Sequence, residues 1–159
     1  MRRAAAVLIA LAISGLLTAC SPGQDGIAAI GYDMNGRLVG AVKVCGEEMV
    51  EAELVRSHGP NLTWHRASPL QGGTDSWPLQ GASAGTWTAD RGSLSALASR
   101  DHYVFVVWSE GRAYRSQFLD FYGKDVTGLK PGEVLTGQLG SADPESRVIA
   151  LDELSGESC

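Results

Sequence analysis

The sequence predicts an all-β domain, either an antiparallel β-sandwich or a small barrel, with at most one short helix. The chain has 159 residues, enough for one domain, and 20 of them are glycine. Amphipathic helical periodicity is scarce, whereas short apolar runs recur about every 8–15 residues with turn-forming residues between them. One of these turns, Asn35-Gly36, is a strong hairpin signal because both residues tolerate the positive φ angles of a tight turn.

The first strands are predicted around that turn. Apolar segments 27–33 and 37–45 flank it and predict a hairpin. Segment 49–56 alternates apolar residues with glutamates, which is the period of a half-buried strand with the glutamates on its solvent face. A helix over 47–56 is the alternative for this segment.

The most apolar stretch after the N-terminal region is 102–108, His-Tyr-Val-Phe-Val-Val-Trp. Its β-branched and aromatic residues predict a central strand buried on both faces. The other expected elements are one or two helical turns at 93–99 and short strands at 62–66, 76–79, 85–88, 113–118, 134–137 and 147–151.

The block Val126-Thr127-Gly128-Leu129-Lys130-Pro131-Gly132 resembles the Leu-x-Pro-Gly loop of fibronectin-type and other immunoglobulin-like sandwiches. It departs from their pattern at Val134-Leu135, where those families have a tyrosine. The resemblance implies an immunoglobulin-like arrangement of the strands.

The N-terminus has the layout of an export signal. An apolar run over 4–16 follows Arg2 and Arg3 and ends in Leu17-Thr18-Ala19-Cys20. This run is about 13 residues long, whereas a spanning helix needs roughly 20, so it is typical of a signal peptide. The segment resembles the signal peptide and lipobox of bacterial lipoproteins, and the Ala-, Gly- and Arg-rich composition is similar to that of actinobacterial proteins.

This resemblance implies a location and a domain organisation. Residues 1–19 would be removed, Cys20 would carry the lipid, palmitate included, and 20–26 would form a short polar tether to a single domain over 27–159. The protein would then lie on the extracytoplasmic face of the cell membrane. In a cell with two membranes, Ser21 in place of an aspartate implies the outer membrane.

The two cysteines that remain, Cys45 and Cys159, are expected to form a disulfide. An even pair of cysteines in an oxidising compartment is usually joined. Two free thiols are the alternative.

The charge of the chain excludes one class of partner. The formal net charge is −5, and removal of Arg2 and Arg3 with the leader makes the domain more acidic. Phosphate backbones require a basic face, so nucleic acid is not an expected partner. Acidic side chains are also repelled by anionic lipid, so membrane contact is expected through the lipid on Cys20.

No catalytic, cofactor or metal motif is convincing. Gly81-Ala82-Ser83-Ala84-Gly85 matches the nucleophile elbow G-x-S-x-G, but no strand and helix alternation surrounds Ser83. The histidines have no zinc-ligand spacing among themselves or with Asp101. We therefore expect no cofactor, no metal and no enzymatic activity; the histidines are His58, His65 and His102.

Three tryptophans, Trp64, Trp77 and Trp87, lie in polar segments and are candidates for stacking on a ligand. The favoured interpretation is that they instead fill the two ends of a small sandwich. The favoured function is a lipid-anchored, non-enzymatic domain that binds a protein partner at the cell envelope. The alternative is a glycan-binding or cell-wall-binding module, or a minor envelope hydrolase, that uses these tryptophans if they are exposed.

Overall fold

The computed structural model describes residues 22–81, 83–91, 94–137 and 146–159. It confirms the all-β prediction, because one twelve-stranded sheet makes up most of the described chain. The strands are β1 (Gly23–Tyr32), β2 (Leu38–Val44), β3 (Met49–Arg56), β4 (Leu62–Leu70), β5 (Gly73–Pro78), β6 (Ser83–Ala84), β7 (Trp87–Arg91), β8 (His102–Trp108), β9 (Tyr114–Ser116), β10 (Leu119–Tyr122), β11 (Glu133–Thr136) and β12 (Arg147–Ala150).

The helical segments are short. In the described residues they are the α-helix α2 (Gly123–Thr127) and the 3₁₀ segments η2 (Glu110–Arg112) and η3 (Leu151–Gly156). Segment 94–98, where helical turns were expected, has no regular structure, so that expectation is wrong for these residues. Instead Leu94 donates a backbone hydrogen bond to Leu79 (3.3 Å) and both side chains are buried.

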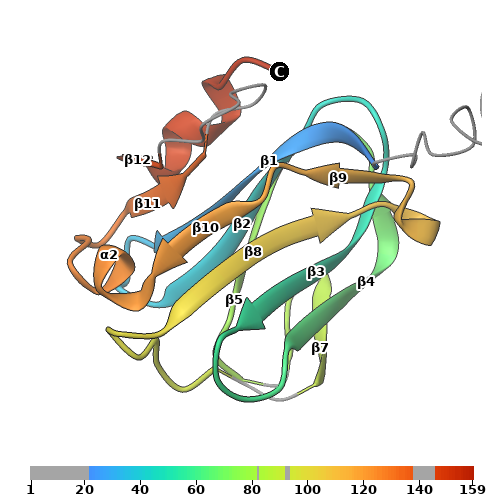
Figure 1. Cartoon of the computed structure of the whole chain (residues 1–159). Helices are drawn as coiled ribbons and strands as arrows, with labels where there is room; N and C mark the ends of the chain where they lie inside the picture. Colours follow the sequence, from blue (N-terminus) through green and yellow to red (C-terminus); the bar gives the residue numbers. More distant parts are fainter. Residues whose placement is uncertain (1–21, 82, 92–93, 138–145) are drawn as a thin grey trace, which may run out of the picture.

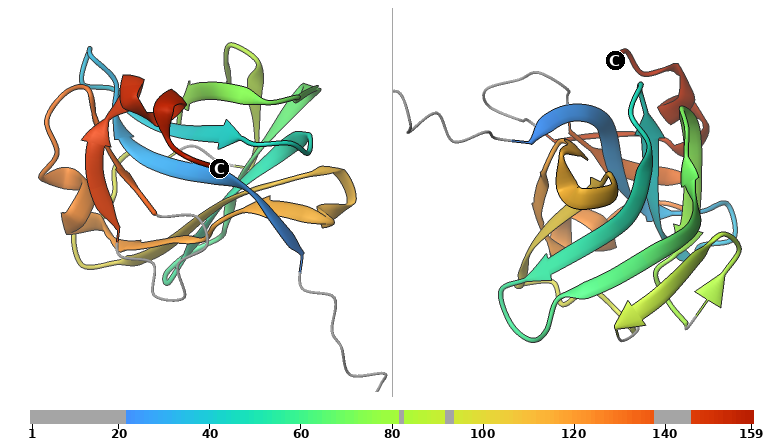
Figure 2. Two further views of the ribbon diagram at one scale, coloured as in Figure 1. Left: turned by 90° about the horizontal axis from the view of Figure 1, so that it is seen from above. Right: turned by 90° about the vertical axis from the view of Figure 1, so that its right-hand side faces the viewer.

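The sheet curls into a nearly closed, barrel-like shape (Figures 1 and 2). Its strands follow the order β12-β11-β1-β9-β8-β3-β4-β7-β6, with β2 and β5 continuing from the other edge of β1 and β10 beside β8. The two ends of this ring meet where β5 approaches β6. There the Asp75 carboxylate of β5 accepts hydrogen bonds from the Thr86 hydroxyl and the Trp87 indole N–H, each 3.1 Å long.

Strand β1 begins earlier than expected, so the boundary between tether and domain at 26/27 is wrong. Residues Gly23 to Gly26 pair with β9 in parallel, in register with Tyr114 to Ser116. The Tyr114 ring packs directly on the Gly23 backbone, where a Cβ would lie 2.6 Å from the ring. Asp25 is held as well, since its carboxylate accepts the Glu47 backbone N–H. The sheet therefore begins three residues after Cys20.

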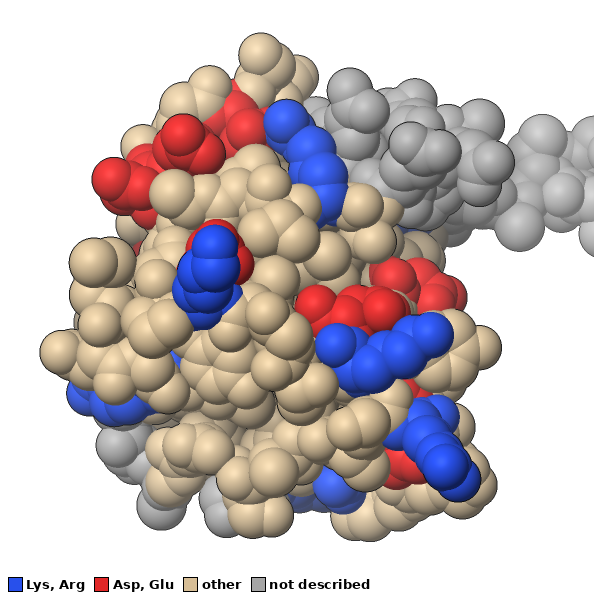
Figure 3. All heavy atoms as spheres, turned by 90° about the vertical axis from the view of Figure 1, so that its left-hand side faces the viewer, with Lys and Arg blue, Asp and Glu red and all other residues tan. Residues whose placement is uncertain are grey.

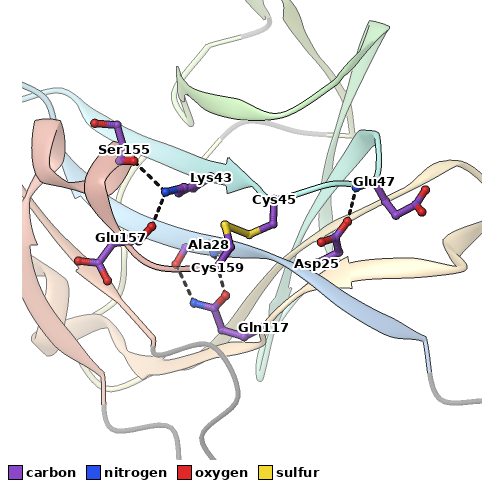
Figure 4. Close-up of a disulfide and its surroundings, with 9 residues drawn as sticks. All are labelled: Asp25, Ala28, Lys43, Cys45, Glu47, Gln117, Ser155, Glu157 and Cys159. Carbon is purple, nitrogen blue, oxygen red and sulfur yellow. Dashed lines mark hydrogen bonds between the residues drawn. A yellow bond between two sulfur atoms is a disulfide. The ribbon is translucent and has the colours of Figure 1, made fainter.

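Along one edge, β1 pairs first with β9 and then with β11, and a buried side-chain amide binds the β1 backbone between these two partners. The Gln117 side chain accepts the Ala28 N–H at Oε1 (3.1 Å) and donates from Nε2 to the Ala28 carbonyl (3.4 Å) (Figure 4). Both backbone groups of Ala28 are thereby satisfied without a neighbouring strand.

The hairpin around Asn35-Gly36 is confirmed, with β1 and β2 in register from Gly26–Val44 to Tyr32–Leu38. Segment 49–56 is strand β3, so the helix alternative is wrong. β3 pairs with β4 on one side and β8 on the other.

Strand β8 has the predicted bounds but not the predicted burial on both faces. Its Tyr103, Phe105 and Val107 point inward, whereas Val104 and Trp108 are partly exposed. Two other strands are continuously buried, β1 from Gly26 to Gly31 and β2 from Leu38 to Val42.

The outer face of β1 and β2 is buried by the C-terminal cover, which we define as β11, β12 and η3. Ile27, Ala29 and Ala41 form a second apolar cluster with Val134 and Leu154 of the cover. Figure 2 shows η3 lying over β1 and β2. Burial of apolar side chains under the cover stabilises it at roughly 25 cal/mol per Å².

A disulfide joins the cover to β2, as predicted from the cysteine count. Cys45 and Cys159 are bonded, with their Cα atoms 5.7 Å apart (Figure 4). Beside it, the Lys43 ammonium donates to the carbonyls of Ser155, at 2.8 Å, and Glu157. The last residues of the chain are thus tied to an early strand by a covalent bond and by hydrogen bonds.

Candidate functional site

The three tryptophans nominated from the sequence are part of the core. Trp64, Trp77 and Trp87 are each 1% exposed, so the favoured interpretation that they are buried is confirmed, and the alternative that they present a stacking surface is wrong. The rings of Trp77 and Trp87 stack on each other at 4.1 Å. The polar residues around them point outward, because successive side chains of a strand alternate between the two faces. The glycan-binding and hydrolase alternative therefore loses the residues on which it depended.

The outer face of β3, β4 and β7 carries a depression that we call the polar groove. Its volume is about 460 Å³. Period-two alternation puts its residues on one face, since β4 sends Trp64 inward while Thr63 and His65 point out. The lining residues are Glu51, Glu53, Asn61, Thr63, His65, Asp90, Arg91 and Arg112.

One wall of the groove is a pair of carboxylates held by one guanidinium. Glu51 and Glu53 lie two residues apart on β3, and Arg112 reaches them from η2. Its Nη2 contacts Glu51 Oε1 and lies 3.4 Å from Glu53 Oε2. The Asn61 amide donates to the other Glu53 oxygen at 3.0 Å. These contacts compensate two like charges that face the same groove.

The Arg112 guanidinium also lies over an aromatic ring. Its central carbon is 5.0 Å from the ring centroid of Trp108, the residue of β8 that pairs with Glu51 of β3. A cation at this position is attracted by the negative face of the indole. The carboxylates of the groove and the neighbouring Trp108 ring are therefore directed at the same guanidinium.

The aromatic face continues away from the groove. Phe118 packs edge-on against Trp108, with the centroids 6.1 Å apart, and the Arg115 guanidinium lies 4.0 Å from the Phe118 centroid. Desolvation by burial lowers the pKa of Arg115 from its ordinary value. The guanidinium groups of Arg112 and Arg115 thus each lie over one ring of this aromatic pair.

The other wall of the groove pairs a histidine with an aspartate. His65 Nδ1 lies 3.3 Å from Asp90 Oδ2, and both side chains are about half exposed. Each of the other histidines also lies beside an aspartate, His58 at 3.5 Å from Asp101 and His102 next to Asp120. Within the described residues, no group of three or more His, Cys, Asp or Glu side chains is arranged to hold a metal ion.

The remaining residues singled out from the sequence lie elsewhere. Cys20 falls outside the described residues. The backbone of Ser83 belongs to β6, which pairs with β7 in an antiparallel hairpin. A nucleophile elbow needs a turn from a strand into a helix, which this segment does not form.

The groove itself was only partly visible in the sequence. The alternation over 49–56 correctly placed Glu51 and Glu53 on the solvent face. The sequence carried no sign that Arg112, about 60 residues away, would reach the same face, because that contact depends on the pairing of β3 with β8.

Comparison of the chain with protein-family models, with curated proteins and with solved structures gave no match. In the part of the chain that the structure describes, we find no helix with the length and apolar character needed to cross a membrane.

Proposed function

We propose that the protein is a lipid-anchored, non-enzymatic domain on the extracytoplasmic side of the cell membrane, where it binds a protein partner through the polar groove. The observation that carries the binding role is the groove itself. It is open to solvent, and carboxylate, guanidinium, amide and imidazole groups converge on it from several strands. Such an arrangement offers directional contacts to a polar surface.

The proposed anchor would hold the domain close to the bilayer. The sheet starts at Gly23, so only Ser21 and Pro22 separate it from Cys20, and the chain covers three residue steps. At about 3.4 Å per residue this segment reaches roughly 10 Å when fully extended. The partner would therefore be a protein at or very near the same membrane.

The charge distribution fits a protein partner better than a nucleic acid. On the face shown in Figure 3, acidic and basic side chains are scattered over a mainly neutral surface. The groove is likewise mixed in charge, with three carboxylates and two guanidinium groups among its lining residues. Polar protein surfaces of mixed charge are complementary to such a lining, whereas a phosphate backbone is not.

The anchor is tested by labelling the protein in a bacterial host with an alkyne analogue of palmitate. The wild-type chain should take up the label and sediment with membranes, and Cys20→Ser should lose both properties. Uptake of equal label by Cys20→Ser would contradict lipidation at this cysteine.

The binding role is tested by photo-crosslinking in the bacterium that produces the protein. A benzophenone amino acid replaces Thr63, which lines the groove, or Val148, which is 50% exposed on β12 and serves as the control. A protein adduct that forms from position 63 and not from position 148 supports the proposal. Identical adducts from both positions, or no adduct from position 63, contradict it.

A further inference from the structure

Arg112 occupies a position that is built to hold a guanidinium group. Glu51 and Glu53 approach it from one side and the Trp108 ring from another. Outward residues at i and i+2 on a strand are about 6–7 Å apart, and Nη2 of the Arg112 guanidinium lies between the two carboxylates at this spacing. Lysine has a point charge on a flexible stem and cannot both bridge two carboxylates and stack flat on an indole.

The site does not require that the guanidinium come from Arg112. The two carboxylates are held by the regular register of β3, and Asn61 orients one of them. The ring is held by β8, whose Trp108 pairs with Glu51. These parts belong to the sheet, whereas Arg112 belongs to a short turn on its rim.

The Arg112 side chain is also exposed enough to leave the carboxylates and enter solvent. Its side chain is 48% exposed, compared with 20% for Glu51 and 14% for Glu53. Salt bridges of such exposed arginines contribute little to stability, so the bound and released forms of the side chain are close in free energy. A second guanidinium can therefore compete for the carboxylates.

We propose that Glu51, Glu53 and the Trp108 ring form a binding site for an arginine side chain of a protein partner, and that Arg112 fills this site within the chain until the partner displaces it. The partner in this statement rests on the proposed function, whereas the guanidinium site does not. Because Arg112 competes with the ligand, the apparent affinity of the wild-type protein is reduced by the fraction of molecules in which the site is open.

The test measures binding of a single guanidinium to the full-length chain in a non-ionic detergent. The probe is Nα-acetyl-arginine amide, and its neutral isostere Nα-acetyl-citrulline amide is the control ligand. The four tryptophans are replaced by 5-fluorotryptophan, and the fluorine signal of Trp108 is assigned by its loss in Trp108→Phe. The signals of the other three tryptophans report whether each variant keeps its core.

Arg112→Ala should bind the arginine probe about three- to sixfold more tightly than the wild-type protein, with a shift of the Trp108 signal. The affinity of Arg112→Ala is expected to be on the order of millimolar, because the probe would gain charge-assisted contacts to two partly exposed carboxylates and a cation–π contact. Arg112→Gly should bind the probe as tightly as Arg112→Ala. Because glycine adopts the φ of 57° at this position readily, this variant controls for distortion of the turn. Addition of Glu51→Gln and Glu53→Gln to Arg112→Ala should remove the binding.

Equal affinity of Arg112→Ala and the wild-type protein for the arginine probe would overturn the inference, as would equal binding of arginine and citrulline probes. The outcome is separable from that of the proposed function. Guanidinium binding without a crosslinked partner would support this site and contradict the partner, whereas a partner crosslinked from the groove without guanidinium binding would do the reverse.

Discussion

Two regions of the same sheet have outer faces of opposite polarity. Over β1 and β2 the outer face is apolar and lies under the C-terminal cover, whereas over β3, β4 and β7 it is charged and open as the polar groove. Both regions share the same interior, where alternate side chains of all these strands enter the main core.

The difference follows from the residues at alternate positions of each strand. In β1 the outward positions include Ile27 and Ala29, whose exposure to water is unfavourable, so a covering segment is stabilised there. In β3 the corresponding positions are Glu51 and Glu53, and covering these carboxylates without partners would cost several kcal/mol. The surface available for binding is therefore the one where alternation places charged residues outward.

The largest expected effect is removal of the covalent tie of the cover. Cys45→Ser with Cys159→Ser opens a crosslink between residues 114 positions apart. From the loop-closure entropy, the unfolding free energy should fall by up to about 5 kcal/mol. Urea denaturation without reductant measures this loss. Binding of the arginine probe in the Arg112→Ala background should be unchanged below the unfolding transition. A loss of less than about 1 kcal/mol would show that the disulfide does not stabilise the fold.

A cavity under the cover should have the next largest effect. Leu154 is fully buried in the second apolar cluster, and Leu154→Ala is expected to reduce the unfolding free energy by about 2–4 kcal/mol. Val148→Ala, at a position on the same cover that is 50% exposed, should change it by less than about 0.5 kcal/mol. Similar losses in both variants would mean that the cover is not packed as described.

Substitution of Arg112 at the groove should lower the unfolding free energy much less, and the loss should depend on salt. Arg112→Ala removes the contacts to Glu51 and Glu53 and should cost about 0.5–1 kcal/mol at low ionic strength. Arg112 has a φ of 57°, in the left-handed region, so Arg112→Gly should be more stable than Arg112→Ala by about 1 kcal/mol. Urea denaturation at low and high salt measures both effects. High salt should reduce the difference in unfolding free energy between the wild-type protein and Arg112→Ala, and it should leave the difference between Arg112→Ala and Arg112→Gly unchanged.

The smallest expected effect concerns the turn that joins the two covered strands. Burial works to raise the pKa of Asp33, but hydrogen bonds from the Arg37 backbone and side chain and from the Asn35 backbone outweigh it and lower the pKa below the ordinary 3.8. A lowered pKa contributes stability that is fully present above pH 3.8 and is lost as the pH falls through the folded value.

Asp33→Asn tests this contribution, because the amide oxygen can still accept the backbone bonds while the charge is absent. The wild-type protein should exceed Asp33→Asn in unfolding free energy by less than about 1 kcal/mol at neutral pH. Urea denaturation at several pH values should show this difference shrinking below pH 3.8. A difference that grows on acidification would contradict the assignment.

Local patterns in the sequence were sufficient for several parts of the fold. Alternation and turn residues predicted an all-β chain, the Asn35-Gly36 hairpin and the bounds of β3 and β8. The cysteine count predicted the Cys45–Cys159 pair. Alternation also placed Glu51 and Glu53 on the solvent face. These features depend on neighbouring residues, or on the small number of cysteines, and so can be read without a three-dimensional arrangement.

Other features were decided only by the tertiary structure, because they depend on which strands become neighbours. The polar sequence neighbours of Trp64, Trp77 and Trp87 left two interpretations open, a core position and a ligand-stacking surface, and closure of the sheet buried all three. The burial of β1 on both faces required the cover from the end of the chain. The meeting of Arg112 with Glu51 required β8 to pair with β3, so the contact that defines the groove arose from strand pairing between segments about 60 residues apart.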